Sequence, residues 1–559
     1  MKYKMSNRYH LKLSYFFLIC SLVMINYGCQ KEEVYEQTRL FRPALNKPLT
    51  ALENVITVNM AKIKEATGYV LEISRDSFKT IDYNVKVDTN YIVLNEALLG
   101  EGLLYNTLYQ IRATALGATT DFNSKPADLG AVRTERFPSI LLIPRGFDVT
   151  DTKAKVRWTP AGATITSIKI YALEDFRLRT VLAEYNVPSS SALEGEFIID
   201  QLNPSTGYQV AIFSGNTLRG WVDYTTLVAG VDKTAPNVID LSESEDPKAV
   251  INTFQGAPDY AIILLKKGID YEMPTVGIAK SITIKGDYGF TEKKAGLVAG
   301  IAGANWAFAN GAKGIKIVFD DLEVKGVSFD AHYVFNPANT TLTDIEELRF
   351  ENCIVRNFRG IARIRENVFI RNFIISNSIV TMIRDYGVIT TDTDGENKAA
   401  VDNILFKNST FSKMRTFITS RQNVQSWVME DCTFNEFTTG GQQAFRFRGA
   451  AGRNNAVKGL TIRNCIWGSG WDETNTGNVP VVQFSREGLK ETAITVINTW
   501  ATNDLSIAAG SEMSGFPSLN YTNTSTRLWA NPRAGNFNIN DVSFGGRTDA
   551  GDPRWRVKL

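Results

Sequence analysis

Arginine recurs at short intervals in the second half of the chain. The series consists of Arg363, Arg365, Arg384, Arg415, Arg421, Arg446, Arg448 and Arg486. A guanidinium group presents a planar fork of N–H donors that matches a carboxylate. If successive segments stack on one another, these arginines line one wall as a basic stripe, which suits a long polyanion such as a uronic-acid polymer. The alternative is that they are solvated or paired with nearby Glu366, Asp385 and Glu487.

Aromatic residues near these arginines could stack on sugar rings. Tyr386 lies two residues after Arg384, and Trp467 and Trp471 lie in a Gly-rich segment where we expect exposed side chains. Trp427, in contrast, alternates like a core residue. The sequence therefore predicts a carbohydrate-binding surface that combines arginines with exposed aromatic rings.

One loop carries carboxylates at alternate positions, namely Asp392, Asp394 and Glu396, and these could bind Ca²⁺. A plain hydrophilic loop is the alternative. A polysaccharide lyase would need an Arg or Lys base, and often such a cation to neutralise the substrate carboxylate. The two histidines, His10 and His332, argue against a zinc site and a Ser–His–Asp triad. Catalytic residues stay unassigned, and Ca²⁺ is expected as a cofactor only for a lyase.

A repeated phrase between residues 315 and 500 predicts the scaffold that positions these side chains. It reads apolar–x–apolar–x–Asn or Asp–Cys or Ser–x–apolar, as in residues 348–354. Its Asn/Asp positions are Asp321, Asn352, Asn377, Asn408, Asp431 and Asn464, separated by 31, 25, 31, 23 and 33 residues. A repeat of this length with period-2 strands is typical of a solenoid made of short strands.

The Asn/Asp positions are interpreted as a structural ladder rather than a row of ligand-binding groups. Asn tolerates left-handed backbone geometry, and stacked amides can hydrogen-bond along the solenoid axis. Cys353, Cys432 and Cys465 follow the ladder residues directly, and we expect them to form a buried internal stack. The residues predicted to fill the bore include Leu348, Phe350 and Ile354.

Composition indicates a multidomain, β-rich protein. The 559 residues exceed the size of one core, and 61 basic against 59 acidic residues give a net charge of +2. This balance does not indicate nucleic acid as a partner. Long amphipathic helical windows are hard to find, so the predicted fold class is all-β.

The amino terminus is predicted to be a targeting segment. Residues 1–29 contain basic residues and then an apolar stretch too short to span a membrane, ending at Cys29. A small residue followed by Cys resembles a bacterial lipoprotein cleavage site, and residues 30–37 begin with a sequence that resembles the surface-export signal of Bacteroides-like bacteria. The resemblance implies a protein anchored to the outer membrane through acyl chains on Cys29 and facing the exterior. A plain secretory signal is the alternative.

Two segments, 38–135 and 136–231, are predicted to be small β domains. In the second, the phrase Leu202-x-Pro204-x-Thr206-x-Tyr208-x-Val210 is the one by which fibronectin type III domains are usually recognised. The resemblance implies seven-stranded sandwiches, with Trp158 in the core and Tyr208 as a tyrosine-corner residue. We expect both to act as spacers.

Residues 237–559 resemble right-handed parallel β-helices of the pectate-lyase type. The strand 261–265 with Gly268 and Tyr271, followed by 281–286, is similar to their first coil, and a short helix at 249–251 is expected to cap the end. The carboxyl end, 528–537 and 551–555, is similar to uncharacterised β-helical domains from polysaccharide-degrading loci of Bacteroides-like bacteria.

These features together predict an outer-membrane surface lipoprotein that binds an acidic polysaccharide within a glycan-utilisation system. An outer-membrane glycan importer is a candidate partner. A polysaccharide lyase and a non-catalytic adhesin or scaffold are the alternatives, because the fold does not decide the function.

Overall fold

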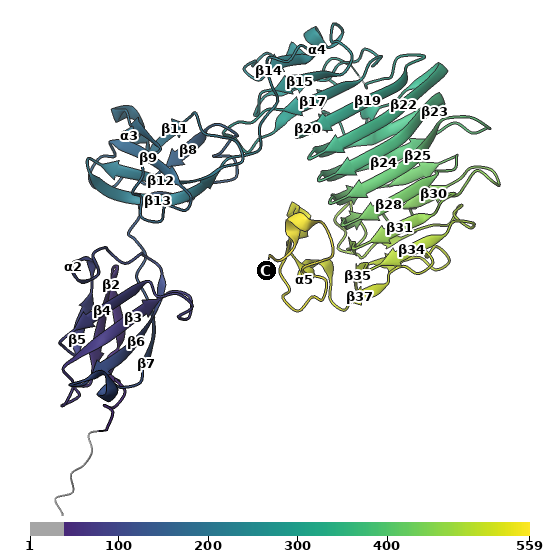
Figure 1. Cartoon of the computed structure of the whole chain (residues 1–559). Helices are drawn as coiled ribbons and strands as arrows, with labels where there is room; N and C mark the ends of the chain where they lie inside the picture. Colours follow the sequence, from purple (N-terminus) through teal and green to yellow (C-terminus); the bar gives the residue numbers. More distant parts are fainter. Residues whose placement is uncertain (1–37, 304, 559) are drawn as a thin grey trace, which may run out of the picture. The chain divides into compact units, whose positions relative to one another are not determined.

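The computed structural model describes residues 38–303 and 305–558, and strands dominate them (Figure 1). The targeting segment, Cys29 and the export linker 30–37 lie outside the described residues. The helical pieces are α2 (Glu96–Leu99), α3 (Ser189–Glu194), α4 (Ala249–Phe254), α5 (Ser525–Leu528), η1 (Thr120–Phe122), η2 (Pro532–Ala534) and η3 (Pro553–Trp555). Across the described part of the chain, no helix combines the length and apolarity needed to cross a bilayer.

The first domain is an antiparallel sandwich of two sheets. One sheet has the order β1-β2-β5 and the other β4-β3-β6-β7. Their bounds are β1 (Leu45–Leu52), β2 (Val55–Met60), β3 (Gly68–Ser74), β4 (Tyr83–Val87), β5 (Tyr91–Leu94), β6 (Leu108–Leu116) and β7 (Ala127–Arg133). The Tyr109 hydroxyl accepts a hydrogen bond from the Leu104 backbone N–H at 2.9 Å, which closes a tyrosine corner. The domain and the segment Glu174–Thr180 form one compact unit.

The second domain has the same two-layer design. Its sheets have the orders β10-β9-β12-β13 and β11-β8, and a bridge between Leu141 and Trp158 extends the smaller one. The bounds are β8 (Ala154–Arg157), β9 (Ser167–Ala172), β10 (Ala183–Asn186), β11 (Glu196–Ile199), β12 (Gly207–Ser214) and β13 (Thr217–Thr225). Trp158 is buried in the core, and the Tyr208 hydroxyl accepts from the Asn203 backbone N–H at 2.9 Å. Both roles predicted from the fibronectin type III phrase are confirmed.

The third domain is a solenoid of parallel strands that run around it in coils (Figure 1). We name its three strand surfaces the first, second and third walls. The first wall contains β14 (Val238–Leu241), β15 (Ala261–Leu265), β17 (Ile282–Gly286), β19 (Lys313–Asp320), β22 (Ala338–Glu351), the end of β23 (Ile354–Ser376), β25 (Ala400–Lys407), β28 (Ser426–Glu430), β31 (Leu460–Arg463) and β34 (Ile494–Ile497).

The second and third walls follow in each coil. The second wall contains β16 (Asp270–Glu272), β18 (Ala295–Ala299), β20 (Leu322–Gly326), the start of β23, the start of β24 (Ile379–Thr391), β26 (Thr410–Met414), β29 (Thr433–Phe437), β32 (Ile466–Trp467), β35 (Trp500–Thr502) and β37 (Leu519–Tyr521). The third wall contains β21 (Tyr333–Phe335), the middle of β23, the end of β24, β27 (Ile418–Ser420) and β30 (Phe445–Phe447). Two short pairs complete the domain, β33 (Val481–Val482) with β36 (Ser506–Ile507), and β38 (Trp529–Asn531) with β39 (Asn536–Ile539).

The predicted fold class, two fibronectin type III-like sandwiches followed by a right-handed parallel β-helix, is confirmed. The predicted cap is present as well, because Val250 and Phe254 of α4 are buried and the Phe254 ring lies 5.1 Å from that of Trp306.

The Asn/Asp ladder forms the corner between the first and second walls. All six predicted members adopt left-handed geometry, as does a further member, Asn498, with φ between 42° and 55°. Side-chain amides connect neighbouring coils, for example from Asn408 Nδ2 to Asn377 Oδ1 at 3.1 Å and from Asn464 Nδ2 to Asp431 Oδ1 at 3.1 Å. The structural interpretation of the ladder is therefore confirmed.

A second left-handed corner lies five residues after the ladder and separates the second wall from the third. Its members are Asn357, Met382, Lys413 and Glu436, with φ between 49° and 65°. These four residue types share no side-chain chemistry, so the backbone geometry here is imposed by stacking against neighbouring coils rather than by local propensity. This corner gave no recognisable sequence signal.

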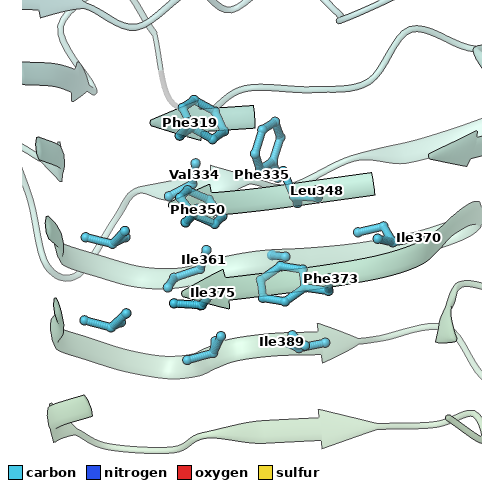
Figure 2. Packing of buried hydrophobic residues seen from close by; sticks show 14 of the residues in the cluster. Phe319, Val334, Phe335, Leu348, Phe350, Ile361, Ile370, Phe373, Ile375 and Ile389 are labelled. Carbon is cyan, nitrogen blue, oxygen red and sulfur yellow. The ribbon is translucent and has the colours of Figure 1, made fainter. Parts of the chain in front are cut away.

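The bore is filled by aromatic and branched side chains in register (Figure 2). Phe319 pairs with Phe350 across neighbouring coils, and their rings stack at 4.9 Å. Leu348 and Phe350 are fully buried, as predicted, and Cys353, Cys432 and Cys465 are buried free thiols. The assignment of Ile354 to the bore is wrong. The left-handed residue Asn352 resets the alternation, so Cys353 and Val355 point inward and Ile354 is only half-buried.

Candidate functional site

Five of the predicted arginines belong to the third wall. Together with neighbouring residues they form two rows of side chains on its outer face. Strand register aligns Arg363, Thr390, Thr419 and Arg446 in one outward row. The second row contains Arg365, Asp392, Arg421 and Arg448. Each of these residues directly follows an inward-facing residue of its strand. Arg486 lies on the next coil, where its backbone N–H donates to the Gln443 side chain at 3.2 Å. We call Arg363, Arg365, Arg421, Arg446, Arg448 and Arg486 the arginine wall.

Carboxylates neutralise part of the arginine wall. Asp392 pairs with Arg363 at 2.5 Å and lies 3.9 Å from Arg421, and Glu487 pairs with Arg446 at 3.2 Å. Glu366, in contrast, pairs with Lys398 at 3.4 Å. Arg365 donates to the backbone and side-chain oxygens of Asn336, both at 3.2 Å.

Three members of the arginine wall have no carboxylate partner in the part of the chain that the structure describes: Arg365, which bonds Asn336, and the exposed Arg448 and Arg486. Within the described residues, no carboxylate lies within 4.0 Å of Arg448 or Arg486, and both are exposed. The pKa of Arg448 is lowered from its ordinary value by partial burial first, and then by repulsion from Arg446 and Arg421. A negative charge placed here would relieve that repulsion.

The remaining predicted arginines, Arg384 and Arg415, form a separate row with Arg359, which was not predicted, and we call this row the arginine column. Arg359, Arg384 and Arg415 each lie seven residues after a ladder residue, on three successive coils. Asp385 lies 3.4 Å from Arg359, 3.7 Å from Arg384 and 3.0 Å from Arg415. The single basic stripe expected from the sequence is thus two rows with different surroundings.

Tyr386 lies between arginines rather than on an open face. The guanidinium groups of Arg363 and Arg359 lie over its ring, at 4.3 Å and 5.0 Å from the ring centroid. The ring also contacts the Tyr333 ring edge-on at 5.3 Å. These cation–π contacts orient both guanidinium groups. Tyr386 therefore supports the arginines, and its ring contacts protein on several sides.

The expectation that Trp467 and Trp471 are exposed is wrong. Trp467 is fully buried and stacks on Phe434 at 3.9 Å inside the bore. Trp471 is 7% exposed and meets Phe329 edge-on at 6.1 Å. The reason is positional, because Trp467 continues the inward alternation that follows Asn464. Trp427 is fully buried, as predicted.

The carboxylates of the acidic loop pair with arginines and are not arranged around a common centre. Asp392 pairs with Arg363, and Asp394 lies 3.1 Å from Arg453 and 3.8 Å from Arg421. Within residues 38–303 and 305–558, no group of three or more His, Cys, Asp or Glu residues could hold a metal ion.

The thiols of Cys353 and Cys432 are not activated as nucleophiles. Burial raises the pKa of the Cys353 thiol to about 12, and burial with the neighbouring Cys465 raises that of Cys432 as well. A thiol at neutral pH is then protonated and inert.

Two family models match parts of the solenoid. Residues 269–414 match the family described as Domain of unknown function (DUF4957), and residues 427–555 match Domain of unknown function (DUF5123). A search of curated proteins finds no match.

Structural comparisons find fibronectin domains. The FN1–FN3 domains of chicken CNTN1 align at 13% identity and a TM-score of 0.15, over 34% of this chain and 66% of that one. A two-domain fibronectin type III segment of chicken tenascin aligns at 17% identity and a TM-score of 0.15, over 34% of this chain and 99% of that one. The fold assignment rests on the strand orders given above.

Proposed function

We propose that the protein binds an acidic polysaccharide at the cell surface, and that the arginine wall is the binding face. The observation that supports it best is the exposure of two arginines without a carboxylate partner, Arg448 near Arg446 and Arg421, and Arg486 on the next coil. Charged hydrogen bonds from guanidinium to carboxylate are the strong ones, at about 1.5–3 kcal/mol each. Guanidinium groups on successive coils, about 4.8 Å apart, offer a polymer several such bonds at once.

The two sandwiches and the anchor complete this proposal. A lipid on Cys29 would hold the chain on the outer face of the outer membrane, with the sandwiches as spacers and an importer as a neighbour. Membrane fractionation checks the anchor, since Cys29→Ala should release the protein into the soluble fraction. Persistence of that variant in membranes would contradict lipidation at this residue.

Retention on polygalacturonate gels tests the binding face. Replacing Arg446 and Arg448 together by Gln should weaken retention at least about tenfold, because two charged contacts are lost. A matched control replaces Arg349 and Arg463, which pair with Glu347 and Glu430 at 2.8 Å on the first wall. The control makes the same change in net charge and should leave retention unchanged. Equal retention by the two double variants would refute the arginine wall as the site.

The same incubation distinguishes binding from cleavage. A lyase would release unsaturated products that absorb in the ultraviolet, with or without added Ca²⁺. Binding without such products supports a non-catalytic role, whereas their appearance would make the protein an enzyme.

A further inference from the structure

The arginine column differs from the arginine wall in the origin of its carboxylates. Arg384 forms an ion pair with Asp330, and Arg415 forms one with Glu473 at 2.6 Å. Asp330 follows ladder residue Asp321, two coils before the coil of Arg384. Glu473 follows Asn464, two coils after the coil of Arg415. Both carboxylates therefore reach the column along the solenoid axis, from opposite directions.

Asp330 and Glu473 lie in two loops, and we call these two loops together the latch. They are residues 327–332, between β20 and β21, and residues 468–480, after β32. Their ladder residues, Asp321 and Asn464, are five coils apart, which corresponds to about 24 Å at about 4.8 Å per coil. The rings of Phe329 and Trp471 nevertheless meet at 6.1 Å, so the loops lean toward each other over the column.

The contact between the Phe329 and Trp471 rings helps the two loops to cover the arginine column. The Arg384 guanidinium lies over the Phe329 ring at 5.5 Å, and Trp471 is 7% exposed although its loop is polar. The two ion pairs differ in exposure, since the Asp330 side chain is 65% exposed and the Glu473 side chain is 24% exposed. An ion pair as exposed as that of Asp330 contributes little net stability, so a soluble anion can compete for Arg384 first.

We propose that Arg384 and Arg415 form a second anion-binding site, which Asp330 and Glu473 of the latch occupy until a polyanion displaces them. The two loop carboxylates stand in for the carboxylates of the ligand. The site lies on adjacent coils, so it takes a polymer with closely spaced acidic groups. This inference rests on the proposed function, because the latch regulates access for the same class of ligand.

The test replaces the latch carboxylates in the full chain by Asp330→Asn with Glu473→Gln. We expect affinity for polygalacturonate to rise about three- to fivefold, because the ligand then competes only with Asp385 for these two arginines. Adding Arg384→Gln and Arg415→Gln should remove this gain. Limited proteolysis provides a second measurement, since cleavage within 468–480 should be faster in the latch variant at an unchanged unfolding temperature.

The outcomes separate the two proposals. Native or weaker affinity in the latch variant, with binding still lost in the Arg446→Gln, Arg448→Gln double variant, would overturn the latch and leave the proposed function standing. Failure of both the native chain and the latch variant to bind any acidic polymer in a panel would overturn both.

Discussion

Replacing Trp467 by Ala separates a core role from a sugar-binding role. The ring stacks on Phe434 at 3.9 Å and lies 4.9 Å from Phe437 and 5.3 Å from Phe484. Its Nε1–H has no hydrogen-bond partner within the described residues, so the substitution removes packing alone. A buried Trp covers about 150–250 Å², which at about 25 cal/mol per Å² gives ~4–6 kcal/mol. Measured Trp-to-Ala costs are about 3–5 kcal/mol, so we expect about 4 kcal/mol.

Thermal and denaturant unfolding measure this loss. With an unfolding entropy of about 2.1 cal/mol/K per residue over roughly 320 residues, 4 kcal/mol lowers the unfolding temperature of the solenoid by about 6 °C. Trp467→Phe keeps most of the ring contacts and removes the unpaired N–H, so its cost should be below about 2 kcal/mol. A Trp467→Ala variant that loses polysaccharide retention but unfolds as the native chain does would refute the buried assignment.

Two further predictions concern the corners of the solenoid. Asn408→Ala should cost about 1–2 kcal/mol of unfolding free energy, because it loses the bond to Asn377 and places Ala in left-handed geometry, whereas Asn408→Gly should cost less. Equal costs for Ala and Gly would contradict the backbone part of this reasoning. Burial raises the pKa of Glu436 above its ordinary value of 4.5, so its charged form is disfavoured in the folded state. The unfolding free energy of the native chain should therefore fall as pH rises from about 4.5 through the folded pKa. Glu436→Gln should be the more stable protein at neutral pH, and its advantage should vanish below about pH 4.5; a pH-independent difference would contradict this cause.

The arrangement of the arginines was predictable in part. The sequence places arginine after every predicted ladder residue from Asn352 onward, and Arg384 and Arg415 share the same offset of seven residues from Asn377 and Asn408. Applying that offset to Asn352 finds Arg359, which sequence reasoning missed. Both rows follow the second corner in the chain, so the division into a wall and a column depends on how far beyond that corner each arginine lies.

The sequence by itself determined the repeat and its register. Period-2 alternation, the Asn/Asp ladder and the cysteine positions are local patterns, and one strand geometry satisfies all of them. The phrase from Leu202 to Val210 likewise identifies the second sandwich through its tyrosine corner at Tyr208.

Tertiary structure decided which polar groups remain free for a ligand. Asp330 and Glu473 neutralise arginines two coils away, and such pairs depend on stacking rather than on neighbourhood in the chain. Burial of Trp467 likewise follows from the corner at Asn464, because a single left-handed residue sets which of the following side chains face the bore. The local sequence specifies the strands of each coil. Contacts between coils decide which side chains are exposed and which charges are neutralised.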